Sequence, residues 1–529
     1  MRSHVYVNSS DMRRLRRLAG STTLLLVGPL VIQAQLTSRA RASTNPASNI
    51  RTLALTWHPV RDGSSEVAAL VVAETLSAAT DPHAFSLRAP ITYAGVRGIA
   101  ERIQQLAVHD SLGEVPLEAS DEPADPGGFP NYRHWRTTRP VHGAITISYR
   151  ALVQPPPGRG PPFGVRAYAG GVSGAGSGFL VLPEHQGTVR SHVHWDLSEL
   201  AAGASAVATY GDGDFERVGD PDDLMQTWIM AGPLGKSRGT GLAIGFTAAW
   251  LGEPAFDAAR EMAWAARMYA YLAMSYRYLD PPPHYRVFIR VLPDARGATA
   301  LANSFMLVAP PAGASAPSTA SIRETMTHEM GHMWVGDIEG PIGVTSWFTE
   351  GLNTYYTRLL PMRAGFDSVG EYGRRINEDF KTYFTSPARN LSADSIVKIG
   401  FNDEDVRHIP YYRGSFYFAD LDSRIRAASH GRRNLDSLVI SRFRRRVLGE
   451  RFDQDAWIAA VTKEIGPSAR ADFERVILRG ETIVPPSDAF GPCVTRRPAS
   501  LTPKSGGVPV AGYQWVRVDS IPDARCRVW

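Results

Sequence analysis

The sequence reads THEMGHMWVGD over residues 327–337 and TSWFTEGLNTYY over residues 345–356, and we expect a helix at each stretch. Histidines at positions i and i+4 of a helix project from one face, a single turn apart, so His328 and His332 can share one tetrahedral metal ion. Glu329 lies between them and can reach the open coordination position, where a water molecule would bind. The spacing therefore predicts a metal site on the first helix.

A catalytic zinc ion takes three protein ligands and keeps one position for water. The second stretch supplies a carboxylate, Glu350, near the start of its helix, after a glycine- and proline-containing turn that would fold this helix back antiparallel to the first. The alternative for Glu350 is an ordinary acidic position near a helix N-terminus, where the helix dipole favours negative charge. We predict one zinc ion per chain, bound by His328, His332 and Glu350, with Glu329 as the general base.

These two stretches resemble the zinc site of gluzincin metallopeptidases in the aminopeptidase N and leukotriene-hydrolase superfamily, with a spacing to Glu350 that is one residue shorter than usual. The run EGLNTYY that begins at Glu350, YYRG over residues 411–414 and GRRNLDSL over residues 431–438 are more similar to the bacterial glycyl aminopeptidase family. The resemblance covers most of residues 190–480. It implies a thermolysin-like, mostly helical zinc domain and an aminopeptidase-like hydrolase that acts on peptides or small proteins.

The resemblance also implies two further site positions. In both families a tyrosine beyond the third ligand helps to hold the tetrahedral intermediate, and the matching residue is Tyr411, with Tyr412 and Tyr417 as nearby alternatives. These exopeptidases usually carry an acidic residue, on the strand before the zinc helix, that pairs with the free amine of the substrate. Ala300 stands at that position here and cannot anchor an ammonium group, which leaves the choice between exopeptidase and endopeptidase open.

Two other interpretations of the site stay open. The first is a catalytically degenerate protein that binds peptides as a scaffold, which the missing acid at Ala300 favours. The intact histidines and Glu329 argue against it, because a binding module has no need of a general base. The second is a zinc hydrolase that opens an epoxide or an ester, since it would use the same metal chemistry.

The length and patterning predict a multidomain α+β protein, because 529 residues exceed what one core usually serves. Short β-type runs separated by turns predict a β-rich, sandwich-like domain over residues 43–250. A helical period then predicts the catalytic domain over residues 251–480, where Ser321 and Glu324 form a capping box that starts the histidine-bearing helix. Residues 481–529 form a short appendage, or a reduced remnant of the PDZ-like domain of the glycyl aminopeptidase family.

Residues 1–42 have the pattern of an export signal, with clustered arginines before an apolar stretch that is too short and interrupted for a membrane span. We therefore predict an exported protein, periplasmic or secreted, without stable membrane insertion after the signal is removed; a retained N-terminal anchor is the alternative. In an exported chain, the only two cysteines, Cys493 and Cys526, are expected to form a disulfide.

The net charge is +5, and the densest basic cluster, over residues 442–446, lies in a segment that is predicted to form a helix over residues 434–447. We interpret this cluster as a solvated helix face, with a phosphate-binding patch as the alternative. No nucleic-acid motif accompanies it, so no nucleic-acid partner is predicted. His192 and His194 would share one strand face, where ordinary surface histidines are a simpler interpretation than metal ligands.

Overall fold

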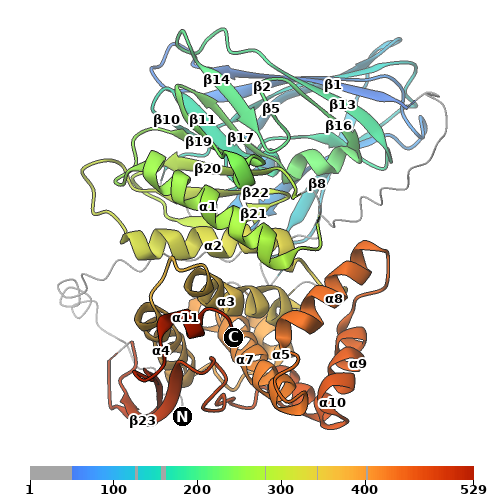
Figure 1. The fold of residues 1–529 in the computed structure, drawn as a ribbon. Helices are drawn as coiled ribbons and strands as arrows, with labels where there is room; N and C mark the ends of the chain where they lie inside the picture. Colours follow the sequence, from blue (N-terminus) through green and yellow to red (C-terminus); the bar gives the residue numbers. More distant parts are fainter. Residues whose placement is uncertain are drawn as a thin grey trace, which may run out of the picture.

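The computed structural model describes residues 50–125, 129–156, 162–279, 282–341, 343–400, 403–504 and 506–529. The predicted export signal over residues 1–42 lies outside these ranges. In Figure 1 the N-terminal sheets lie above a mixed layer that contains the helices α1 and α2, and the remaining helices lie below that layer. The prediction of a β-rich N-terminal region followed by a mostly helical region is confirmed.

The N-terminal region begins with a large, mostly antiparallel sheet. It has seven strands, in the order β16 (Phe215–Gly219), β13 (Val189–Trp195), β1 (Thr52–Val60), β2 (Ala69–Leu76), β9 (Ile145–Leu152), β5 (Ile103–Asp110) and β6 (Gly113–Glu114). The strands form because apolar and polar residues alternate: Ile145, Ile147 and Tyr149 of β9 are buried, and the residues between them are exposed.

Two smaller sheets complete this region. One has the order β12 (Leu182–Pro183), β3 (Ser86–Tyr93), β8 (Asn131–Thr137) and β7 (Leu117–Asp121), with β4 (Val96–Arg97) paired to β3. The other has the order β10 (Arg166–Tyr168), β11 (Gly171–Ala175), β17 (Trp228–Gly232), β14 (Ser205–Ala208) and β15 (Gly211–Asp212). Trp57 of β1 is fully buried and meets Trp195 and Phe179 edge to face, with ring centroids 5.2 and 5.4 Å away.

A fourth sheet supports the helices that follow it. Its order is β18 (Leu234–Arg238), β19 (Phe246–Leu251), β20 (Tyr285–Val291), β22 (Ser304–Ala309) and β21 (Gly297–Leu301), so strands on both sides of residue 250 share it. The helix α1 (Ala258–Tyr276) connects β19 to β20, which run parallel. β21 is the edge strand, and it places Ala300 opposite Phe305 of β22.

The helical region is built around one aromatic-rich core. Its helices are α2 (Thr319–Val335), α3 (Ser346–Arg363), α4 (Val369–Thr385), α5 (Ala393–Ile399), α6 (Glu404–Arg407), α7 (Ile409–Ala428), α8 (Leu435–Val447), α9 (Gln454–Ile465) and α10 (Ser468–Phe473). Trp347 of α3 lies in this core and meets Phe473 of α10 at a centroid distance of 4.8 Å. None of the helices that the structure describes is long and apolar enough to cross a membrane.

The chain ends in a hairpin, β23 (Val494–Leu501) and β24 (Val510–Arg517), and a short helix, α11 (Asp523–Cys526). Trp515 of β24 is buried against Phe380 of α4, at a centroid distance of 5.1 Å. The predicted disulfide between Cys493 and Cys526 is confirmed, with the two Cα atoms 5.7 Å apart. The bond closes the tail into a loop and so limits its freedom in the unfolded chain.

Candidate zinc centre

The helix α2, which carries both histidines, begins one residue after Ser318. The Ser318 hydroxyl accepts a hydrogen bond from the backbone N–H of Ser321, at 3.1 Å. The predicted capping box is therefore wrong, because Ser321 already lies within the helix. Glu324 instead pairs with Arg358 of α3 (2.6 Å) and faces Arg375 of α4 (3.5 Å). Two buried guanidinium groups need a nearby negative charge, and this need fixes the place of the carboxylate.

The structure brings the three predicted metal ligands together. The Nε2 atoms of His328 and His332 lie 3.2 Å apart, and the Glu350 Oε2 atom lies 3.2 Å from the first and 3.5 Å from the second. Within the described residues, this is the one group of three such side chains whose ligand atoms all lie within 4.8 Å of one another. Two imidazole nitrogens and one carboxylate oxygen form a donor set that is typical of a catalytic zinc site with one open position.

A side-chain amide on α3 fixes the two ligand-bearing helices against each other. Nδ2 of Asn353 donates to the backbone carbonyl of His328, at 2.7 Å, inside the protein. A methyl group added to Gly331 would lie 2.1 Å from Oδ1 of Asn353, so the residue at 331 must be glycine for the amide to fit. Asn353 was not among the site residues predicted from the sequence. Its position three residues after Glu350, on the same helix face, was the available signal.

The charges at the site favour metal binding. Burial alone would raise the pKa of Glu350, but His332 and the hydrogen bond with His328 outweigh burial and lower this pKa to about 2. Burial lowers the pKa of His328, which favours the neutral imidazole that a metal needs. Burial also acts to lower the pKa of His332, but the negative charge of Glu350 raises it overall. Glu350 is therefore ionised and ready to bind a cation.

Glu329 is fully buried, and neither oxygen of its carboxylate has a hydrogen bond of normal geometry within the described part of the chain. Burial raises the pKa of Glu329 to about 8, although the nearby His332 and the backbone N–H of Ala300 favour the charged form. A bound cation would also favour the charged form of Glu329 and so lower its pKa. A buried carboxylate that lacks a well-formed hydrogen bond is costly, and such groups are concentrated at functional sites. Its place beside the ligands suits a group that exchanges protons.

Of the three candidate tyrosines, Tyr411 faces the metal-binding group. Its ring stacks on that of His328, with centroids 5.8 Å apart and planes 19° apart. Burial raises the pKa of Tyr411 well above its ordinary value, and the negative charges of Glu350 and Glu329 raise it further, so the phenol keeps its proton. Tyr417 instead accepts a hydrogen bond from the indole of Trp457, at 3.3 Å, in the aromatic core.

Three more positions named from the sequence have a clear place. Ala300 lies on the edge strand β21, is buried, and has its backbone N–H beside Glu329. The structure thus puts an uncharged residue at this edge of the site. His192 and His194 lie on β13 and are exposed; they face Glu216 (3.3 Å) and Asp214 (2.7 Å). Neither belongs to the metal-binding group.

A partly buried aspartate, Asp337, lies near His332 and was also not predicted from the sequence. The hydroxyl of Thr349 donates to Oδ1 of Asp337 at 2.9 Å, and Arg446 donates to the backbone carbonyl of Asp337 at 2.7 Å. Burial raises the pKa of Asp337, while Thr349 and His332 oppose this effect. The aspartate therefore fixes the end of α2 to the residue that precedes Glu350.

Comparison with known proteins gives a fold match and no sequence match. No protein-family model matches the chain, and no curated protein matches it. An aminopeptidase N family protein from Idiomarina loihiensis superimposes with a TM-score of 0.69 at 14% identity, over 85% of this chain and 79% of that one. An identity of 14% is so low that this match describes the fold alone.

Two other solved structures have the same architecture. An M1 zinc metallopeptidase variant from Deinococcus radiodurans, bound to a Tyr-Ser-Ala substrate, has a TM-score of 0.52 at 18% identity, over 83% of this chain and 95% of that one. Yeast LTA4 hydrolase has a TM-score of 0.52 at 12% identity, over 82% of this chain and 69% of that one. The chain therefore has the fold of the aminopeptidase N and LTA4 hydrolase superfamily.

Proposed function

We propose that the chain is a zinc-dependent peptidase that binds one zinc ion through His328, His332 and Glu350. The observation that carries the proposal is the fully buried carboxylate of Glu329 beside this donor set, for which the described residues supply no hydrogen bond of normal geometry. A protein that only bound peptides would gain nothing from such a costly group. A peptide as the substrate is supported by the tripeptide bound to the structural neighbour from Deinococcus radiodurans.

Each residue of the site has a distinct part in the proposed reaction. When bound, zinc would polarise the scissile carbonyl and lower the pKa of its water to about 7. Glu329 would take a proton from the attacking water and deliver it to the leaving amine. The hydroxyl of Tyr411 would donate a hydrogen bond to the developing oxyanion, an interaction that strengthens in the transition state.

The proposed specificity is aminopeptidase-like, with an unusual treatment of the substrate amine. Ala300 offers no counter-charge for an ammonium group at the edge strand. A free N-terminus would have to be recognised by other groups, or the enzyme would accept a blocked N-terminus as well. Comparing the hydrolysis of peptides with free and with blocked N-termini therefore measures whether the enzyme, with Ala300 at this position, still requires a free amine.

We also propose that the mature protein acts outside the cytoplasm, in the periplasm or medium. The arginine-rich and apolar pattern of residues 1–42 supports export. The disulfide between Cys493 and Cys526 also supports it, because such bonds persist in oxidising compartments. Fractionation of the native host, with N-terminal sequencing of the recovered protein, tests this: a cytoplasmic protein that keeps residues 1–42 would contradict it.

The experiment that tests the function combines zinc analysis with paired substrates. Mature protein is analysed for bound zinc and assayed on a panel of peptides, each with a free and an N-acetylated N-terminus, before and after treatment with a chelator. We expect about one zinc per chain and chelator-sensitive hydrolysis. Glu329→Gln should keep zinc and lose activity by a factor of about 10²–10⁴, because it removes the general base.

The controls separate the alternatives. Glu378→Gln changes an exposed glutamate of α4 in the same way and should leave activity unchanged. Cleavage of free peptides alone supports an aminopeptidase, and equal cleavage of acetylated peptides supports an endopeptidase. Turnover of esters or epoxides without peptides would instead support the non-peptidase hydrolase. Bound zinc without turnover of any substrate would support the scaffold.

A further inference from the structure

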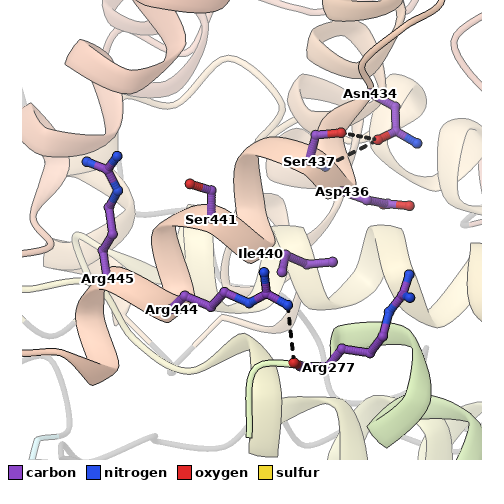
Figure 2. A pocket seen from close by; sticks show the side chains of 8 residues that line it. All are labelled: Arg277, Asn434, Asp436, Ser437, Ile440, Ser441, Arg444 and Arg445. Carbon is purple, nitrogen blue, oxygen red and sulfur yellow. Dashed lines mark hydrogen bonds between the residues drawn. The ribbon is translucent and has the colours of Figure 1, made fainter.

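A separate pocket lies between the C-terminal end of α1 and one face of α8, and none of its lining residues belongs to the zinc group (Figure 2). Its volume is about 700 Å³, which is within the range of small-molecule sites. From α8, the positions Ser437, Ser441 and Arg444 follow one another at helical spacing and share one face. Arg277 comes from the other side, directly after α1.

The guanidinium groups at this pocket are largely unengaged. Among the described residues, Arg277 has no side-chain hydrogen bond or ion pair, and Arg444 makes only a long hydrogen bond, 3.4 Å, to the backbone carbonyl of Arg277. The next residue along α8, Arg445, has a single distant carboxylate, Glu450, at 3.7 Å. The basic cluster is thus not a uniformly solvated helix face, since part of it borders a recess.

By contrast, Arg446 on the same helix is held by contacts within the protein. Arg446 donates to the backbone carbonyl of Asp337 at 2.7 Å and lies over the ring of Phe443, 4.9 Å from its centroid. Arg446 therefore has a structural task that accounts for its presence. Arg277 and Arg444 have no such task, although both project into the same recess.

The one carboxylate in the pocket does not cancel this positive charge. Asp436 accepts hydrogen bonds from Nη1 of Arg363, at 2.6 Å, and from the hydroxyl of Tyr356, at 2.9 Å. Its charge is therefore used by an arginine of α3 that does not line the pocket. The recess keeps an excess of positive charge, and an anion that entered it would meet two guanidinium groups without displacing an existing ion pair.

The backbone at Arg277 adds a second observation. This residue ends α1 in the left-handed conformation, with φ 50° and ψ 18°. Glycine is the usual residue at such a helix end, because a side chain is disfavoured there. The chain has an arginine at this position, and its side chain points into the pocket.

We propose that this pocket binds a small molecule that carries an oxyanion group, a phosphate or a carboxylate, between Arg277 and Arg444. The planar guanidinium fork pairs with two oxygens of such a group at once, and the hydroxyl of Ser441 is available as a further donor. The proposal goes beyond the peptidase function, because the pocket and the zinc group share no residue.

Isothermal titration calorimetry tests this on the full mature, zinc-loaded protein at low ionic strength. The probes are inorganic phosphate, glycerol phosphate and succinate. We expect one-to-one binding that weakens as salt is added. Tighter binding of the two phosphates identifies a phosphorylated ligand, and tighter binding of succinate identifies a carboxylate ligand. Arg277→Ala and Arg444→Ala should each weaken binding by at least about tenfold, because each removes charge-assisted hydrogen bonds.

The matched control is Arg497→Ala, which removes the same charge from an exposed position on the C-terminal hairpin. It should bind the probes as the wild type does. The two pocket arginines are exposed, so their variants should fold, and melting temperatures equal to that of the wild type verify this. Absence of binding for all three probes would overturn the proposal. Equal affinity in the wild type and both pocket variants would also overturn it, because the anion would then bind at another site, such as the zinc ion.

Discussion

Gly351 of α3 and Gly414 of α7 meet backbone to backbone. A methyl group added to Gly351 would lie 2.5 Å from the Cα of Gly414, and one added to Gly414 would lie 2.2 Å from the carbonyl oxygen of Trp347. Real side chains do not approach so closely, so the helices can cross here only because both residues are glycine. Glu350 comes directly before Gly351, and Tyr411 lies one turn before Gly414. The crossing therefore sets how the carboxylate and the phenol lie relative to each other.

Gly414→Ala should force α3 and α7 apart. We expect a loss of about 1–3 kcal/mol in the free energy of unfolding, as for other overpacked cores, together with weaker zinc binding. Denaturant unfolding and zinc content measure the two effects. Gly370→Ala is the control, because its added methyl group would meet only the hydroxyl of Ser368, at 3.7 Å. A Gly414→Ala protein with wild-type stability and zinc affinity would show that the crossing is not constrained.

Tyr411→Phe should remove the proposed hydrogen bond to the oxyanion without disturbing the fold. We expect kcat to fall by a factor of about 10²–10³ with little change in KM, because the bond forms in the transition state. Steady-state kinetics with a cleaved peptide measure this. Tyr417→Phe removes a hydroxyl of the aromatic core instead and should leave kcat near the wild-type value. The role of Tyr411 would be excluded by a variant with full kcat.

Asn353→Ala should weaken zinc binding. The amide of Asn353 holds the carbonyl of His328, and loss of such supporting bonds typically costs about tenfold or more in metal affinity. Competition with a zinc chelator measures the affinity. At saturating zinc the activity should largely return, because no group of the proposed reaction is removed. The control is Thr357→Val on the same helix, which deletes a buried hydroxyl that has no hydrogen-bond partner among the described residues and should bind zinc normally. Equal affinities in both variants would contradict the prediction.

Glu74→Gln should make the N-terminal region more stable at neutral and alkaline pH. Burial raises the pKa of Glu74 to about 8 in the folded protein, from an ordinary value of 4.5, although the hydroxyl of Tyr149 donates to it at 3.2 Å. Between these values the unfolded chain has released a proton that the folded protein retains, so stability falls as the pH rises. The variant has no such proton to lose.

The size of this effect follows from the same shift. Wild type and Glu74→Gln should have similar stability at pH 4, and the variant should be more stable by about 4 kcal/mol at pH 8. Melting curves at several pH values measure the difference. Glu118→Gln, at an exposed position of β7, should change stability little at any pH. Parallel pH profiles for the wild type and Glu74→Gln would show that Glu74 ionises normally in the folded protein.

The strands around the site differ in how well they can be predicted. The segments over residues 285–292 and 304–309 are rich in β-branched and aromatic residues, which favour strands, and they form β20 and β22. The segment over residues 297–301 reads GATAL, and only the family resemblance, not the composition, places Ala300 on a strand. It forms β21 because it pairs with β22, and this pairing overrides the weak preference of its small residues.

Features that depend on neighbours along one helix were accessible from the sequence. His328 and His332 lie together because a helix places residues i and i+4 on the same face, whatever surrounds it. The start of α2 was harder to predict, since Ser318 and Ser321 are both good capping residues. In the structure Ser318 caps the helix, and Glu324 pairs with arginines of α3 and α4 instead of capping the helix start.

Contacts between distant segments could be learned only from the packed structure. The sequence shows three tyrosines after Glu350, but only the packed structure shows that Tyr411 lies against His328 and that Tyr417 lies in the aromatic core. Likewise, Arg277 and Arg444 belong to helices that are far apart in the chain, and they line one pocket because α8 packs beside the end of α1. Backbone geometry fixes short spacings locally, whereas packing of large side chains and close-fitting glycines sets the distances between helices.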